Sequence, residues 1–136
     1  MNYLLDTNVC IALINGTSSK VRARFAHAAR QKAVLATSAI VVYELWYGVA
    51  KSELAARNAR ALAAFLNSKI EVIEYSERDA HAAGEIRAEL ERRGERIGEY
   101  DTLIAGQAYC RNLTLVTANT REFARVKTLN AEDWTE

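Results

Sequence analysis

The feature that most constrains the fold is an alternation of short apolar segments with longer, alanine-rich segments along the whole chain. Apolar runs at residues 4–5, 34–37, 70–73 and 113–117 are too short for helices and predict buried strands. The segments between them predict helices, and the absence of proline leaves those helices unkinked. Strands separated by helical crossovers form a mostly parallel sheet with helices on both faces, so the expected fold class is α/β.

Capping residues indicate where the helices begin and end. Asp6 is expected to cap a helix that ends at Gly16, and Ser76 with Asp79 forms the pattern of a capping box. The expected helices cover residues 7–15, 19–32, 39–51, 53–67, 77–93 and 100–110, with a short helix near 122–123 and an edge strand near 128–129. In this scheme Ser18 or Ser19, Ser38 and Ser52 open three of the helices.

Length and charge limit the classes of protein to which this chain can belong. The 136 residues predict one domain, 1–136, and show no repeat or linker. With 18 basic and 17 acidic residues the formal net charge is +1, which argues against a histone-like polyelectrolyte. The start of the chain lacks the pattern of a secretory signal, and no apolar run is long enough to span a bilayer. Two cysteines without a CxxC pair fit reduced thiols, and we expect a cytoplasmic protein.

Three acidic residues stand in apolar surroundings close to the expected ends of strands. They are Asp6, Glu44 and Asp101. Each has an ordinary alternative role, since Asp6 can cap a helix, Asp101 can favour a helix start, and Glu44 can pair with a core arginine. Ligands in open α/β sheets bind at the carboxyl ends of strands, so we expect the three acids to converge there.

A cluster of carboxylates needs a cation, because like charges held close together repel and raise one another's pKa. The chain offers only two histidines, so the expected ligands are oxygen atoms. Oxygen ligands favour Mg²⁺, with Mn²⁺ as a substitute, over zinc.

Four segments together resemble one known family. They are LLDTNVCIALI, SAIVVYELWYG, IGEYDTLIAGQA and TLVTANTREFARV, in that order along nearly the whole chain. The sequence resembles the PIN-domain ribonucleases, and most closely the VapC toxins of type II toxin–antitoxin pairs. The resemblance implies a PIN-like three-layer α/β/α sandwich around a central, mostly parallel sheet.

The resemblance also implies an activity and a set of site residues. It implies a Mg²⁺-dependent endoribonuclease that cuts structured RNA, with transfer RNA as the expected substrate and inhibition of translation as the result. Asp6, Glu44 and Asp101 match the acidic triad of the family, and Asn119 matches its fourth position. We expect Asp6 and Asp101 to bind the metal directly. Glu44 is expected to bind through water or to position the attacking water, and Asn119 to hold the metal ligands in place or to bind a weak second ion.

Two positions depart from the family pattern. Glu99 stands where relatives often have proline, and Ala118 stands where they often have asparagine. We expect neither to abolish activity.

RNA and protein partners are expected at other surfaces. Basic residues proposed to hold RNA are Arg22, Arg24, Arg93, Arg96 and Arg121, although each could simply lie on a solvated helix face. Of the aromatic residues around Glu44, Tyr43 is expected in the core. The resemblance implies a VapB-type antitoxin, a homodimer, and larger toxin–antitoxin oligomers that contact DNA only through the antitoxin.

Two other functions compete with this interpretation. A phosphatase of the haloacid dehalogenase type needs Asp-x-Asp after the first strand, but Asp6 is followed two residues later by Asn8. A catalytically idle PIN module that only binds RNA or protein is the second alternative. The presence of all three acids argues against it.

Overall fold

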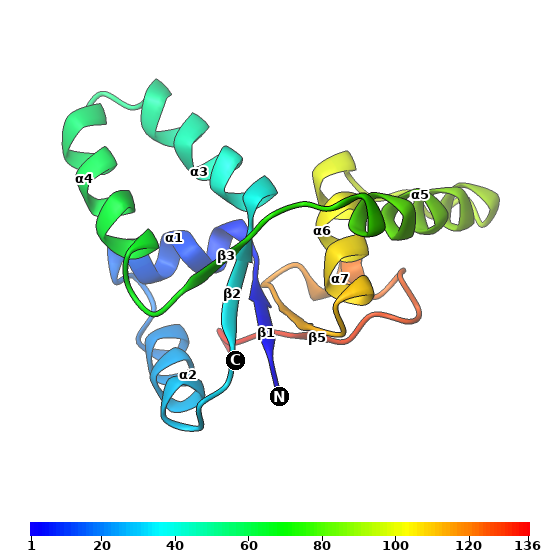
Figure 1. Ribbon diagram of the computed structural model, residues 1–136, viewed down its shortest axis with the longest axis horizontal. Coiled ribbons are helices and arrows are strands. Elements are labelled where there is room, and N and C mark those ends of the chain that lie inside the picture. Colours follow the sequence, from blue (N-terminus) through cyan, green and yellow to red (C-terminus); the bar gives the residue numbers. More distant parts are fainter.

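The computed structural model describes residues 1–136 and is built around a five-stranded sheet in the order β3-β2-β1-β4-β5 (Figure 1). Every pair of neighbouring strands is parallel, which confirms the sheet expected from the sequence. The strands are β1 (Tyr3–Leu5), β2 (Leu35–Ser38), β3 (Glu71–Ile73), β4 (Thr114–Val116) and β5 (Ala131–Glu132).

Helices cover both faces of this sheet, as a three-layer α/β/α fold requires. They are α1 (Thr7–Asn15), α2 (Ser19–Arg30), α3 (Ala39–Lys51), α4 (Ala55–Leu66), α5 (Glu77–Arg92), α6 (Glu99–Cys110) and α7 (Thr120–Phe123). Figure 1 shows α1 to α4 on one side of the strands and α5 to α7 on the other. Parallel crossovers are right-handed, so the helices change face when the strand order reverses after β3. The reversal leaves a switch point between β1 and β4, where α/β proteins bind ligands.

The helix starts follow the capping chemistry in the sequence. Asp6 accepts a hydrogen bond from the backbone N–H of Thr7, and Ser38 accepts one from that of Ile40. The capping box of α5 is complete, because Ser76 and Asp79 each accept from the other's backbone N–H. Both α1 and α3 therefore start directly at the carboxyl ends of neighbouring strands.

Two sequence predictions of element boundaries were wrong. Ser52 does not open α4; it ends α3, its hydroxyl donates to the Val49 carbonyl, and α4 starts at Ala55 without a side-chain cap. The last strand is not at residues 128–129, where the Leu129 N–H bonds to the Val126 carbonyl in a turn. Pairing with β4 begins only at Ala131.

The core lies on both faces of β1, β2 and β4 and includes Trp134 from the end of the chain. Trp134 is 1% exposed and packs edge-on against Tyr3. Cys10 is buried and Cys110 half-buried, and both thiols are free, as expected. None of the helices combines the length and the apolar character needed to cross a bilayer.

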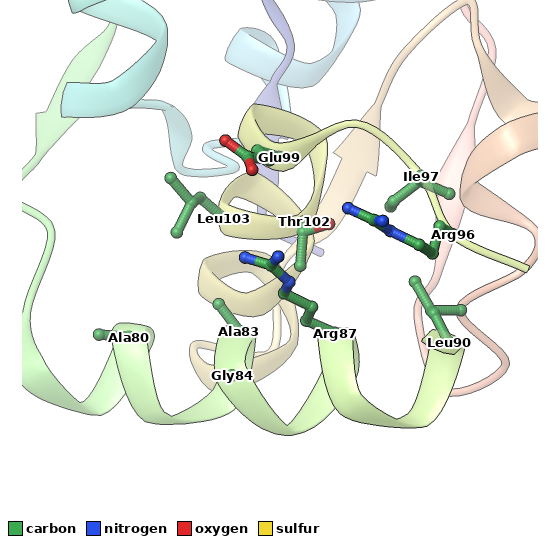
Figure 2. Close-up of a pocket in the computed structure, with 10 residues that line it drawn as sticks. All are labelled: Ala80, Ala83, Gly84, Arg87, Leu90, Arg96, Ile97, Glu99, Thr102 and Leu103. Atoms are coloured by element: carbon green, nitrogen blue, oxygen red, sulfur yellow. The ribbon is translucent and has the colours of Figure 1, made fainter. Parts of the chain in front are cut away.

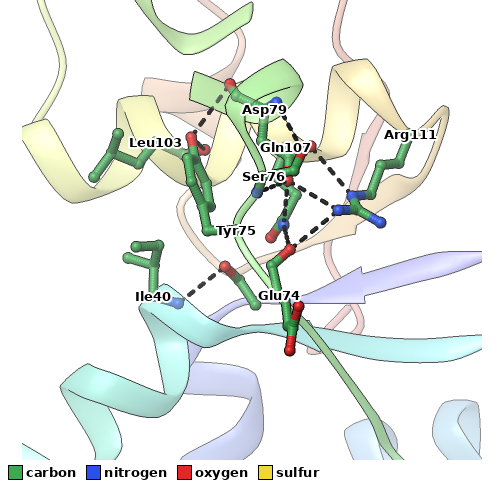
Figure 3. Close-up of polar contacts among 9 residues, drawn as sticks. Ile40, Glu74, Tyr75, Ser76, Asp79, Leu103, Gln107 and Arg111 are labelled. Atoms are coloured by element: carbon green, nitrogen blue, oxygen red, sulfur yellow. Dashed lines mark hydrogen bonds and ion pairs between the residues drawn. The ribbon is translucent and has the colours of Figure 1, made fainter. Parts of the chain in front are cut away.

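Helices α5 and α6 pack closely and are joined by a buried polar network (Figure 3). The carboxylate of Asp79 is fully buried and accepts hydrogen bonds from Gln107 at 2.9 Å and from Arg111 at 3.0 Å. A Cβ atom on Gly106 would lie 2.6 Å from Cα of Ala83, so only glycine allows this approach. The network and the contact together hold α6, which carries Asp101, against the rest of the fold.

Candidate active site

The candidate active site lies at the carboxyl ends of β1 and β4, at the switch point of the sheet. Asp6 directly follows β1, and Thr117 directly follows β4. Asp101 comes from the first turn of α6, and Glu44 from the middle of α3. Segments that are far apart in the sequence thus meet at one edge of the sheet (Figure 1).

Asp6 is held by two hydrogen bonds, one to each carboxylate oxygen. Its Oδ1 accepts from the Thr7 N–H at 2.8 Å, and its Oδ2 accepts from the Thr117 hydroxyl at 2.8 Å. The side chain is buried, with the residue 7% exposed. The helix-cap role and the site role of Asp6 are therefore filled by the same carboxylate.

Glu44 is oriented by the neighbour of Asp6. The Thr7 hydroxyl donates to Oε1 of Glu44 at 2.9 Å, which ties the middle of α3 to the start of α1. No arginine or lysine pairs with Glu44, so the alternative of a core arginine partner is not realised. This leaves the Glu44 carboxylate half-buried and uncompensated.

Asp101 experiences the negative charge of the whole cluster. Burial, followed by the charges of Asp6, Glu122 and Glu44, raises the pKa of Asp101 from 3.8 to about 6. Such a shift is typical of carboxylates that are partly buried and held close together. The three acids predicted from the sequence therefore lie within electrostatic reach of one another.

Glu122 is a fourth acid at this site and was missed in the sequence. Its Oε2 accepts from the side-chain amide of Asn119 at 2.7 Å, and its Oε1 accepts from the Gly98 N–H at 3.3 Å. Asn119 therefore contacts the acidic cluster through Glu122. A signal was available, because Glu122 follows Asn119 by three residues and a helix start places such side chains together.

The chemistry of these residues fits a divalent cation. Four carboxylates gather at one edge of the sheet, and none of them forms an ion pair with a lysine, arginine or histidine. No group of three or more acidic, histidine or cysteine side chains lies close enough together to hold a metal ion, so the structure does not bring Asp6, Glu44 and Asp101 into one set of direct metal ligands. This arrangement suits Mg²⁺, which takes one or two carboxylates and keeps water as its other ligands.

The basic residues expected to hold RNA lie in different places. Arg24 pairs with Glu132 at 3.3 Å and lies over the Trp134 ring, and Arg22 lies against Gly16. Figure 1 places their helix, α2, near the ends where the strands begin, away from the acids. Arg93 is engaged with Glu89 and Glu95. The structure does not gather these arginines into one patch.

Arg96 and Arg121 lie nearer to the acids in the chain. Arg96 belongs to the segment that leads into α6, and Arg121 precedes Glu122 in α7. Both are exposed. Arg121 adjoins Glu122 of the acidic cluster in the sequence, whereas the ion-pair neighbour of Arg96 is Glu91, which lies outside the cluster.

An aromatic pair lies beside Glu44 and Asp101. The expectation that Tyr43 packs in the core was wrong, since the residue is 56% exposed. Its ring lies 5.7 Å from the ring of Tyr100, and the two hydroxyls are 3.3 Å apart. Tyr43 points outward because Val41 and Leu45 occupy the buried face of α3.

Comparisons with known proteins agree with this geometry. The PIN domain family matches residues 3–129. The tRNA(fMet)-specific endonuclease VapC of Shigella flexneri is 41% identical over 98% of both chains, and ribonuclease VapC2 of Rickettsia felis is also 41% identical over 98% of both.

Solved structures of VapBC complexes contain chains with the same fold. VapBC2 of Rickettsia felis bound to promoter DNA superposes with a TM-score of 0.92 at 40% identity, covering 98% of this chain and 99% of that one. DNA-bound VapBC of Salmonella typhimurium superposes with a TM-score of 0.90, also at 40% identity, over 98% of each chain. The chain belongs to the PIN domain family, among the VapC ribonucleases, whose activity depends on a divalent metal ion.

Proposed function

We propose that this chain is the toxin of a VapBC-type pair and a Mg²⁺-dependent endoribonuclease that cleaves transfer RNA. The observation that carries the proposal is the uncompensated cluster of Asp6, Glu44, Asp101 and Glu122 at the switch point. Relatives from Shigella and Salmonella are named tRNA(fMet)-specific endonucleases, which makes initiator transfer RNA the first substrate to test. Manganese, as another hard cation, would replace magnesium.

We propose that some residues of the site bind the metal and that others hold these ligands in place. Asp6 and Asp101 are the proposed direct metal ligands, and Glu44 and Glu122 act through bound water. Thr117 and Thr7 hold two of these carboxylates in place through hydrogen bonds of 2.8 and 2.9 Å. When bound, a divalent cation neutralises charge on the scissile phosphate and activates water for in-line attack.

An antitoxin is the proposed protein partner. A cavity of about 250 Å³ lies beside Glu44 between α1, α3 and α4, lined on its apolar side by residues such as Ile11, Leu45 and Leu62. Such a groove suits the apolar face of an amphipathic segment. We propose that the antitoxin docks here in the cytoplasm, that two toxin copies assemble in the complex, and that DNA is contacted through the antitoxin.

The function is tested by incubating the purified chain with a tRNA(fMet) transcript and mapping the RNA ends. Discrete cuts are expected with Mg²⁺ and no cuts in excess EDTA or with Asp6→Asn. Asn keeps the oxygen that caps α1, so the variant should fold normally. Binding of RNA without cleavage at any metal concentration would instead support the idle PIN module.

A further inference from the structure

A second pocket lies between α5 and the start of α6, on the flank of the helix that carries Asp101 (Figure 2). Its volume is about 270 Å³. Half of its lining is apolar, and the rest comprises two arginines, one glutamate, a threonine and a glycine. The residues used below are Arg87, Arg96, Glu99, Thr102, Ile97 and Leu103.

Both arginines lie near Glu91 through their Nε atoms, and their Nη atoms remain free. Oε2 of Glu91 lies 3.1 Å from Nε of Arg87 and 3.8 Å from Nε of Arg96. No hydrogen bond engages the Nη atoms of either residue. Figure 2 shows both guanidinium groups extending from opposite sides into the same space. Their planes and their outer N–H groups are therefore available to a ligand.

Glu99 contributes an acceptor to the same pocket. Its carboxylate has no ion pair or hydrogen bond, although two arginines line the pocket with it. Thr102 lies one turn further along α6, and its hydroxyl donates to the Gly98 carbonyl, which leaves the oxygen free to accept. Acceptors from one helix thus lie opposite the guanidinium groups.

This mixture of groups favours a nucleobase over a simple anion. A phosphate would use the arginines but would be repelled by Glu99, and it would leave the apolar lining unused. An unpaired base uses all three features, because it can stack on guanidinium planes, pack on apolar side chains and donate to a carboxylate. The volume is below the range of about 300–1,000 Å³ that holds drug-sized ligands, and suits a single planar base.

We propose that this pocket binds one unpaired base of the RNA substrate, and that Glu99 selects guanine there. The N1–H and N2–H groups of guanine form two parallel donors that match a carboxylate, whereas uracil offers only one donor. The proposal rests on the ribonuclease function, and it assigns a role to the glutamate that replaces the usual proline of relatives.

The pocket and the acidic cluster are connected by a short stretch of chain. Glu99 and Thr102 flank Asp101 in the first turn of α6, and Gly98 begins the helix without a side-chain cap. Glu122 of the cluster accepts from the Gly98 N–H. RNA that crosses the start of α6 would therefore place one phosphate near the acids and a neighbouring base in the pocket.

The pocket is tested by nuclear magnetic resonance titration of the full chain carrying Asp6→Asn, with guanosine 5′-monophosphate, uridine 5′-monophosphate and inorganic phosphate as probes. We expect the guanosine nucleotide to shift the amide signals of Ile97, Glu99 and Leu103 and to bind about tenfold more tightly than the uridine nucleotide. Glu99→Gln should reduce this ratio to about two or less. Glu53→Gln, which removes an exposed and unpaired carboxylate elsewhere, should not change it.

A second variant separates stacking from simple charge attraction. Replacing both Arg87 and Arg96 with lysine keeps the charge but removes the planar groups, so guanosine nucleotide binding should weaken about fivefold while phosphate binding stays the same. The proposal is overturned if phosphate alone binds as tightly as the guanosine nucleotide. It is also overturned if these signals respond only to a protein partner such as the antitoxin.

Cleavage of an RNA library with randomised loops distinguishes this proposal from the ribonuclease function. The unsubstituted chain and Glu53→Gln should both prefer guanine at one fixed position from the cut, and Glu99→Gln should lose that preference. An unchanged preference in the variant would refute the pocket and leave the nuclease intact. Nucleotide binding without any cleavage would refute the nuclease and leave the pocket intact.

Discussion

The hydroxyl of Thr117 donates to Oδ2 of Asp6 at 2.8 Å, and so joins the ends of the two central strands across 111 positions of sequence. The same hydroxyl oxygen accepts from the Asn119 N–H at 3.0 Å. Thr117 therefore orients the carboxylate that we propose binds the metal on one side, and shapes the turn into α7 on the other. Groups that hold metal ligands in place commonly affect metal affinity and activity as strongly as some ligands do.

Thr117→Val is expected to weaken Mg²⁺ activation about 10–100-fold, because Asp6 loses its only side-chain partner. The shape of the residue is retained, so thermal unfolding should change little. Thr117→Ser keeps the hydroxyl and should restore most of the activity. Mg²⁺ titrations of cleavage rate measure the effect, and equal loss in both variants would contradict this role for the hydroxyl.

Asp101→Asn should stabilise the metal-free protein while it abolishes cleavage. Because the pKa of Asp101 is raised from 3.8 to about 6, its ionised form opposes folding at neutral pH. The penalty is absent below the unfolded pKa and is complete above about pH 6. In EDTA at neutral pH, the free energy of unfolding should rise by about 1–2 kcal/mol, allowing for solvent screening. Denaturant unfolding at several pH values checks both the sign and the pH range.

Glu122→Gln should change the pH dependence of cleavage. The charge of Glu122 is one cause of the raised pKa of Asp101, so its removal lowers that pKa. Protons then compete less with the metal, and the acidic limb of the pH–rate profile should move to lower pH. Gln retains one acceptor oxygen, so it can keep one of the two hydrogen bonds that Glu122 accepts from Gly98 and Asn119. A limb that stays in place would show that Glu122 does not act on Asp101.

Gly106→Ala should destabilise the fold, whereas Gly84→Ala should not. The new methyl group at position 106 would lie 2.6 Å from backbone atoms of Ala83, and overpacking of this kind costs about 1–3 kcal/mol. A Cβ on Gly84 meets no atom within 4 Å, and alanine in a helix is favoured over glycine by about 1 kcal/mol. Chemical denaturation of both variants provides the comparison.

Arg111→Met should destabilise the protein by about 2–3 kcal/mol at neutral pH, because it leaves the buried Asp79 carboxylate short of a partner. Burial opposes ionisation of Asp79, but Arg111, the Ser76 N–H and Gln107 together lower its pKa from 3.8 to about 2. The stabilisation from Asp79 is therefore present above pH 3.8 and is lost as the pH falls towards 2. The difference between the two proteins should shrink over that range in acid unfolding.

Local chemistry explains most of what could be predicted from the sequence. Capping residues gave the starts of α1, α3 and α5, and apolar runs located the first four strands. The two misplaced boundaries have tertiary causes. Ser52 is used to end α3, and the last strand begins where the chain reaches the edge of β4.

The sequence predicted three acids of the candidate site, Asp6, Glu44 and Asp101, because each stands among apolar neighbours. Glu122 was missed because it follows an arginine in a polar segment and resembles a solvated residue. The exposure of Tyr43 could not be predicted either, since it depends on which face of α3 the sheet covers. Positions of the arginines depend on tertiary ion pairs, which a single sequence does not reveal.

The position of β1 at the centre of the sheet has a consequence for synthesis of the protein. Asp6 leaves the ribosome first, but its partner Thr117 and the strand β4 leave near the end. The site therefore cannot assemble while most of the chain is still being made. The acids encoded early in the chain therefore stay separated from Thr117 until β4 has been made and has paired with β1.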